Sequence, residues 1–338
     1  MPAIANLPSS TLSTEFITTE EEPPSPAPDL SVLISPHLRR LSQKSPAIRK
    51  QFFPSALETE VTDRALLDPL LEDSHSPTKG LVHKYPGRVL ITLTMTCAAY
   101  CRFCTRRRSV SDFQRGLITP RDLTKIISYL NAHEDISEVI FSGGDPLTVQ
   151  SLLIHALESI STIPHIKVIR IHSRVPVSNP VLVTPALYQA IKKVKRQPLY
   201  FSVHFEHPDE ITKRAVAVIN RLRRAGAILM SQSVFLKGVN DDANTLALLF
   251  SRLVQLGIRP YYIYHCDPVR GAEHFIVPFD KEVEIMTKLR CELSGLATPT
   301  FVIDTPSGAG KIPVPLDFWD FDHHHFKDFH QNSFSVID

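Results

Sequence analysis

The chain has 338 residues, of which 43% are hydrophobic and 21% charged, a composition typical of a globular protein with a sizeable core. Its 37 basic and 35 acidic residues leave a formal charge of +2, which argues against a general nucleic-acid-binding protein. The first residues lack the basic and apolar regions of a signal peptide, and no apolar run approaches the length of a membrane span. We therefore predict a cytoplasmic protein with no membrane or nucleic-acid partner.

Three parts of the chain are expected. Residues 1–80 begin with a Pro-rich flexible arm and continue as a helical lead-in, with helical patterns at Val32–Leu41 and Arg64–Leu71. Residues 81–305 alternate strand and helix patterns. Residues 306–338 form a short C-terminal extension with an aromatic, His-rich tail. His323–His325 could bind a metal, and the aromatic residues around Trp319 favour an anchor or a subunit interface, hence a homo-oligomer.

Six strand patterns follow one another between residues 81 and 305, each followed by a helix pattern. They are RVLITLTM, SEVIFSGG, HIKVIRIHS, LYFSVHF, AILMSQSVF and RPYYIYHC, and PTFVIDT is an additional candidate. Continuous apolar strands that alternate with helices predict an α/β fold with a parallel sheet covered by helices. We expect a partial (β/α)6 barrel of the TIM type, with an open doubly wound sheet as the alternative. In both folds, ligands bind at the carboxyl ends of the strands.

Cys97, Cys101 and Cys104 form a CxxxCxxC pattern directly after the first strand. Three thiolates that bind three irons of a [4Fe-4S] cluster leave the fourth iron open to another molecule. S-adenosylmethionine could bind there, and an electron from the cluster would cleave its sulfonium bond to give a deoxyadenosyl radical. Structural zinc is the alternative, but zinc usually takes four ligands, and Cys266 and Cys291 stand alone. The pattern favours a radical S-adenosylmethionine (radical SAM) enzyme.

Two further segments are expected near such a cluster. Arg102 and the run Arg106–Arg108 could offset its charge and bind anionic substrate groups, with a solvated basic surface as the alternative. The segment Ser142-Gly143-Gly144-Asp145 ends the second strand. Backbone without side chains can approach a ligand closely, so this segment could bind an ammonium group.

Six blocks of the sequence together resemble the lysine 2,3-aminomutase family. They are KYPGRVL (Lys84–Leu90), CAAYCRFCTRRR (Cys97–Arg108), FSGGDPL (Phe141–Leu147), RIHSRVPV (Arg170–Val177), SQSVFLKGVND (Ser231–Asp241) and PTFVIDTPSGAGKIPV (Pro299–Val314). The resemblance implies an isomerase that uses the cluster, S-adenosylmethionine and pyridoxal 5′-phosphate. It would move the α-amino group of L-lysine to Cβ, giving β-lysine. A reducing donor such as flavodoxin or ferredoxin is implied as a partner.

The same resemblance assigns cofactor contacts. It implies that Lys311 holds pyridoxal phosphate covalently and that Lys84, Tyr85 and Arg88 contact the phosphate. The remaining cofactor contacts that we expect are Ser142, Gly143, Gly144, Asp145, Ser173, Arg174, His204 and Gln232.

Substrate contacts follow in the same way. Arg106 would bind the α-carboxylate in a bidentate pair. Asp267 and Asp304 would hold the distal ammonium group of lysine. Two anions there would repel the side chain of glutamate, which favours lysine as the substrate. Without the resemblance, each of the two acids could equally cap a turn before a proline.

Several alternatives remain open at this point. Family members that use free lysine typically carry a zinc-binding C-terminal extension, whereas no cysteine follows Cys291 here. On length the sequence resembles the branch that makes β-lysine for elongation factor P, although PTFVIDTPSGAGKIP is closer to the free-lysine enzymes. Glutamate or another amino acid is the alternative substrate. An iron–sulfur electron carrier and a non-catalytic binding protein are the alternatives of another class.

Overall fold

The computed structural model describes residues 30–110, 116–305, 310–318, 325–328, 330 and 332–335. The predicted flexible arm and the predicted metal ligands His323 and His324 lie outside the described residues, and so does Trp319. No helix in the described part of the chain is long and apolar enough to cross a membrane.

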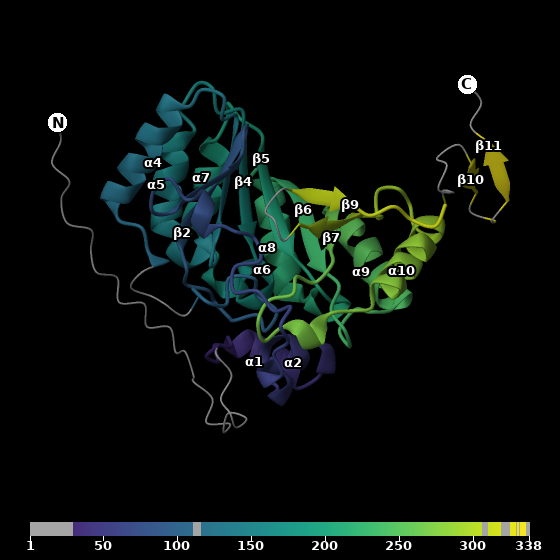
Figure 1. The fold of residues 1–338 in the computed structure, drawn as a ribbon. Coiled ribbons are helices and arrows are strands. Elements are labelled where there is room, and N and C mark those ends of the chain that lie inside the picture. The colour runs from purple at the N-terminus through teal and green to yellow at the C-terminus, as the bar shows by residue number, and fades with distance from the viewer. Residues whose placement is uncertain are drawn as a thin grey trace, which may run out of the picture.

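A nine-stranded sheet organises the chain (Figure 1). Strands β2 to β8 are parallel, and β1 and β9 pair antiparallel to its two ends. The strands are β1 Leu81–Tyr85, β2 Arg88–Thr94, β3 Glu138–Gly143, β4 Val168–Ser173, β5 Leu199–His204, β6 Ile228–Val234, β7 Arg259–Tyr264, β8 Thr300–Asp304 and β9 Lys311–Pro313. A separate hairpin joins β10 His325–Lys327 to β11 Ser333–Ser335.

The strand order decides between the two predicted folds. Each strand of the large sheet lies beside its predecessor in the sequence, whereas a doubly wound sheet reverses its order at a switch point. The sheet is open, with β1 and β9 at its ends, so the predicted partial barrel is confirmed. Its wall has seven parallel strands, because the additional candidate PTFVIDT forms β8 and pairs with β7. The division of the chain at residue 305 stays a prediction. β9 lies after this boundary and pairs with β8, which lies before it.

Helices connect the parallel strands on the outer side of the barrel. They are α4 Pro120–Ala132, α5 Gln150–Ile160, α6 Val175–Ser178, α7 Pro185–Lys193, α8 Lys213–Arg224, α9 Ala243–Gln255 and α10 Phe279–Glu292. A reciprocal pair of hydrogen bonds starts α4, since the Thr119 side chain accepts from the amide of Asp122 and the Asp122 carboxylate accepts from the amide of Thr119.

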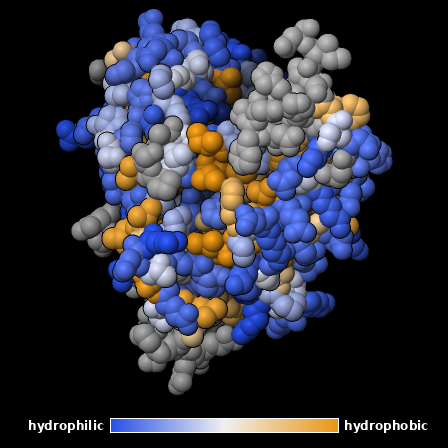
Figure 2. All heavy atoms as spheres, turned by 45° about the vertical axis from the view of Figure 1, so that its right-hand side comes forward, coloured by the Kyte–Doolittle hydropathy of each residue, from blue (hydrophilic) through white to orange (hydrophobic). Residues whose placement is uncertain are grey.

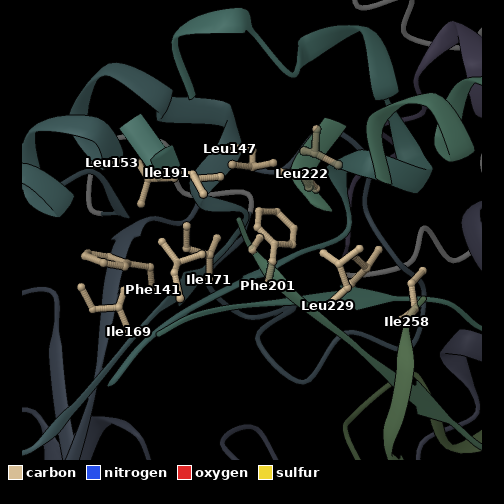
Figure 3. Packing of buried hydrophobic residues seen from close by; sticks show 14 of the residues in the cluster. Phe141, Leu147, Leu153, Ile169, Ile171, Ile191, Phe201, Leu222, Leu229 and Ile258 are labelled. Atoms are coloured by element: carbon tan, nitrogen blue, oxygen red, sulfur yellow. The ribbon is translucent and has the colours of Figure 1, made fainter. Parts of the chain in front are cut away.

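The core lies between the sheet and this helical layer. Figure 3 shows Ile169, Ile171 and Phe201 pointing from β4 and β5 toward the helices that carry Leu153 and Ile191. These five side chains are at most 2% exposed. The intervening residues of the strands point to the other face of the sheet, which carries polar side chains. The strands therefore alternate between core and interior instead of being apolar throughout.

The lead-in before β1 contains α1 Pro36–Ser42 and α2 Pro46–Phe52, each started by a serine that caps its helix and a proline at its first turn. The helical prediction at Arg64–Leu71 was wrong. That stretch forms turns, in which Leu66 pairs with Val269 as an isolated bridge. Pro69 has no amide hydrogen to donate, which disfavours a helix across it.

Figure 2 shows a face on which apolar side chains gather in a central area bordered by hydrophilic ones.

Candidate active site

Two adjoining cavities lie on the inner face of the barrel, with volumes of about 240 and 160 Å³. The smaller cavity contains the three cysteines, and the larger contains Lys311. Six residues line both cavities: Thr105, Arg106, Ser142, His172, His204 and Val234. The three cysteines, Arg106, Asp267, Asp304 and all the predicted cofactor contacts line one or both cavities.

The loop after β2 turns Cys97, Cys101 and Cys104 into the smaller cavity. None of them forms a disulfide, and burial together with the neighbouring thiols raises the pKa of Cys97. Among the described residues, no three His, Cys, Asp or Glu side chains are arranged to hold one metal ion. The donor set of three free thiols in one cavity fits a cluster in which each cysteine binds a different iron.

The glycines after β3 are required by close packing. Gly143 has a φ of +115°, and a Cβ added there would lie 2.5 Å from the carbonyl oxygen of Thr94. A Cβ on Gly144 would lie 2.5 Å from the carbonyl oxygen of Thr96. The Gly-Gly pair therefore lets β3 end directly against the segment that leads to the cysteines.

Asp145 connects the ends of β3 and β4. Its carboxylate accepts from the Ser173 hydroxyl at 2.8 and 3.0 Å and from the amides of Leu147, Arg174 and Val175 at 2.7 to 3.1 Å. The predicted residues Asp145 and Ser173 line the cavity, but their polar groups bind each other and the backbone. This arrangement fixes the wall of the smaller cavity rather than leaving a carboxylate free for a ligand.

Arg174 links the cluster loop to buried polar groups. Its Nη1 lies 2.8 Å from the Sγ of Cys101, and its Nη2 donates to Glu210 at 2.7 Å and to the side chain of Gln51. Glu210 is fully buried and accepts from the amide of Glu206 as well. Burial raises the pKa of Cys101, and the guanidinium of Arg174 opposes this effect by stabilising the thiolate, which is the form that binds iron.

Lys311, Asp304 and Asp267 come together in the larger cavity. The Nζ of Lys311 donates to Asp304 at 2.5 Å, and the Nζ of Lys84 lies 3.9 Å from the other carboxylate oxygen. Burial and the neighbouring Asp304 raise the pKa of Asp267 to about 7. Both ammonium groups approach Asp304, so a further cation beside Asp267 would lower the repulsion between the two carboxylates.

Aromatic and basic side chains also line this cavity. The Arg88 guanidinium lies 4.1 Å from the ring centre of Tyr85, and Arg170 lies over the ring of Tyr261 at 5.9 Å. Arg170 pairs with Glu138, whereas no acidic side chain in the described part of the chain forms an ion pair with Arg88. The predicted phosphate contacts Lys84, Tyr85 and Arg88 are therefore adjacent, at the edge formed by β1 and β2.

Sequence reasoning missed Arg170, Tyr262 and Tyr264 as lining residues, and it gave no role to His172 at the carboxyl end of β4. The available signal was alternation: in β4 Arg170 and His172 alternate with buried isoleucines, and in β7 Tyr262 and Tyr264 flank buried Ile263. Tyr264 extends the predicted polar set, because its hydroxyl accepts from Gln232, which also pairs with His204, both at 3.2 Å. His172 differs, since its buried Nε2 has no hydrogen-bond partner.

Arg106 forms a bidentate pair with Glu72 of the lead-in, at 2.7 and 2.5 Å. Burial raises the pKa of Glu72, but the guanidinium of Arg106 outweighs burial and holds it below its usual value. Arg106 also donates to the carbonyl of Gly143 at 3.2 Å. The guanidinium is thus already oriented to bind a carboxylate where the two cavities meet.

The other arginines of the cluster loop were predicted to bind anionic substrate groups, but they do not line the cavities. Arg102 and Arg107 both bind the carboxylate of buried Glu58, and Arg108 pairs with Asp68 at 2.9 Å. They attach the lead-in to the loop that carries the cysteines. Neither the substrate role nor a solvated surface describes Arg102, whose side chain is fully buried.

Comparisons with known proteins agree with this geometry. The model of the Radical SAM superfamily matches residues 91–249, from β2 into α9. The chain is 42% identical to the L-lysine 2,3-aminomutase of Clostridium subterminale over 79% of this chain and 64% of that protein. It is 38% identical to the L-lysine 2,3-aminomutase of Escherichia coli, over 74% of this chain and 72% of that protein. The chain belongs to the lysine 2,3-aminomutase family.

This membership confirms the resemblance seen in the sequence. Radical SAM enzymes use a [4Fe-4S] cluster and S-adenosylmethionine, and lysine 2,3-aminomutases also use pyridoxal phosphate, as predicted. The family also contains a relative of different specificity, the glutamate 2,3-aminomutase of Clostridioides difficile, which is 36% identical over 76% of this chain and 60% of that protein. The chain spans less than two thirds of the length of the Clostridium subterminale protein.

Proposed function

We propose that this protein is a radical SAM, pyridoxal-phosphate-dependent aminomutase that converts L-lysine into β-lysine. The observation that carries the proposal is the joint placement of Lys311 with two carboxylates in a cavity that adjoins the cavity of three free cysteines. When bound, the cofactors supply radical generation and stabilisation of the migrating amino group. The protein itself binds, orients and shields the reactants.

The residues of the larger cavity fit pyridoxal phosphate. Lys311 provides an amine that is 27% exposed on its side chain and held by Asp304. Lys84 and Arg88 provide cations at one end of the cavity, with the ring of Tyr85 between them. Burial lowers the pKa of Lys84, although Asp304 opposes this effect. An anionic group bound there would stabilise the ammonium form of Lys84 and the guanidinium of Arg88.

The acids favour lysine over glutamate. A lysine side chain would place its ammonium group between Asp267 and Asp304, where it lowers the mutual repulsion of the two carboxylates. A glutamate side chain would add a third carboxylate to the same place. We assign the α-carboxylate of the substrate to Arg106, which would exchange its partner Glu72 for the substrate.

We further propose that the cysteines hold the cluster at the wall formed by Asp145, Ser173 and Arg174, with His204 and Gln232 lining the place of S-adenosylmethionine. The proposed location is the cytoplasm, and the proposed electron donor is a flavodoxin or ferredoxin. Delivery of β-lysine to elongation factor P is the pathway that we propose. Incubation with elongation factor P and its ligase, with labelled lysine as the only source of label, tests it; label retained by free β-lysine alone would contradict it.

The function is tested with anaerobically reconstituted protein. Wild type should show the absorbance of protein-bound pyridoxal phosphate and should form β-lysine from lysine but no β-glutamate from glutamate. Lys311→Ala should lose both the absorbance and the product while keeping its iron content. Lys288→Ala, at an exposed position on α10, is the matched control and should keep both. Wild type without bound cofactor absorbance, or without a β-amino product from lysine, would contradict the proposal.

A further inference from the structure

A strongly basic segment precedes β1. Between Leu30 and Leu57 the sequence contains five lysines and arginines and no aspartate or glutamate. These residues form α1, α2 and their connections, which Figure 1 shows side by side in purple at one end of the molecule. Arg40, Lys44 and Arg49 are exposed. A protein with a formal charge of +2 thus concentrates one sign of charge on a single helix pair.

The inner side of this helix pair packs on the loop of the cysteines. The amide of Tyr100 donates to the carbonyl of Leu33, and the amide of Arg102 donates to the carbonyl of Gln51, both at 2.9 Å. Ala99 belongs to the same buried cluster as Ile48 of α2, and Cys101 packs against it. One layer of helices, each about 10 Å across, therefore separates this side of the loop from solvent.

The amino end of α8 adds to the basic surface. Lys213 and Arg214 are exposed at its first turn, directly after the loop of Glu210, which binds the arginine at the Cys101 thiol. Burial, Arg214 and Arg40 together lower the pKa of His37 on α1, so the charges of both arginines act on the same helix. We call the exposed side chains Arg40, Lys44, Arg49, Lys213 and Arg214 the basic face.

We propose that the basic face is the docking surface for an acidic one-electron carrier protein. The inference rests on the proposed function, because it assumes a cluster on Cys97, Cys101 and Cys104 that must be reduced. The carrier loses one electron and the cluster gains one, and no proton or chemical group moves between the two proteins. Opposite charge steers such a carrier to this end of the barrel and raises the rate of association. Docking there also places the carrier against the helices that contact the cysteine loop.

The experiment compares two double variants with the same change of charge. Arg40→Glu/Lys44→Glu reverses two charges of the basic face. Lys192→Glu/Lys195→Glu reverses two exposed charges near the carboxyl end of α7, which leads to the amino end of β5, at the opposite end of the barrel from the cysteines. Exposed substitutions of this kind leave folding largely unchanged. The probes are a reduced flavodoxin, which is acidic, and dithionite, a small reductant that needs no docking surface.

We expect the basic-face variant to bind flavodoxin about 10-fold or more weakly than wild type at low salt, with a shallower dependence on salt. Flavodoxin-driven bleaching of the cluster absorbance should slow by a similar factor, while dithionite-driven bleaching is unchanged. The α7 variant should match wild type in all three measurements. Equal loss in both variants, or an unchanged flavodoxin affinity of the basic-face variant, would overturn the proposal.

Failure of the proposed function is visible separately. Flavodoxin binding and cluster bleaching are measured without lysine, so they test the basic face even if no β-lysine forms. Absence of β-lysine with dithionite in wild type would contradict the proposed function alone.

Discussion

The two cavities differ in how their polar groups are satisfied. In the smaller cavity, Asp145 accepts from a hydroxyl and three amides, and Arg174 donates to three acceptors. In the larger cavity, charged groups pair with each other across elements, as Lys311 does with Asp304 and Arg106 with Glu72. The smaller cavity is therefore preorganised, whereas the larger holds ion pairs that a charged ligand can replace.

Removal of a thiol should have the largest effect, because it breaks the preorganised cavity at one of the metal ligands that we propose. We expect Cys101→Ser to lose the absorbance and iron of the cluster and to reduce β-lysine formation to background. Cys291→Ser on α10 is the control and should keep both. Iron analysis and absorbance of the reconstituted proteins provide the measurement. Full iron content in Cys101→Ser would assign the cluster to other ligands.

The second prediction breaks an exchangeable pair in the larger cavity. Asp304→Asn keeps the shape of the side chain but removes the charge that binds Lys311 and, in our proposal, the substrate ammonium. Since hydrogen bonds to charged groups contribute about 1.5–3 kcal/mol, the KM for lysine should rise about 10- to 100-fold. Cluster absorbance should not change. Asp280→Asn, at the exposed start of α10, should leave the KM as in wild type.

The difference between the cavities also explains what the sequence could predict. The barrel class and the strand positions follow from periodicity along the chain, the cysteines follow from their spacing, and the contacts of the larger cavity follow from the resemblance to the family. The pairing of Arg102 and Arg107 with Glu58 does not, because it joins residues more than 40 positions apart through the turns of the lead-in. Arg170 was missed because β4 was treated as apolar throughout, although its alternation with Ile169 and Ile171 placed it in the interior.

The third prediction concerns the junction of the cavities. His172 lines both, and its buried Nε2 has no partner, so a bound ligand is the expected partner. Burial and Arg170 hold the pKa of His172 well below its usual value, so the ring donates or accepts while neutral. We expect His172→Ala to raise the ratio of 5′-deoxyadenosine released to β-lysine formed several-fold, with little change in iron content. His155→Ala, at an exposed position on α5, is the control.

An unchanged ratio in His172→Ala would assign the ring to packing. His172→Asn tests the same point from the other side, since its amide can replace one hydrogen bond of the ring and should restore part of the coupling.

The last effect is expected on stability, because burial and the neighbouring Asp304 both disfavour the charged form of Asp267. Folding raises the pKa of Asp267 from 3.8 to about 7. Between pH 4 and pH 7, the folded protein therefore binds more protons at this site than the unfolded chain does. Raising the pH through this window therefore lowers the free energy of unfolding, and the full destabilisation is present above pH 7. Asp267→Asn removes the charge. The cofactor-free variant should be more stable than wild type at pH 8, by on the order of 1–4 kcal/mol, and should lose this advantage near pH 4. Urea unfolding at both pH values measures the difference, with Asp280→Asn as the control. An advantage of equal size at pH 4 and pH 8 would mean that the substitution acts through packing, and that the acids of the larger cavity do not repel each other in the absence of a ligand.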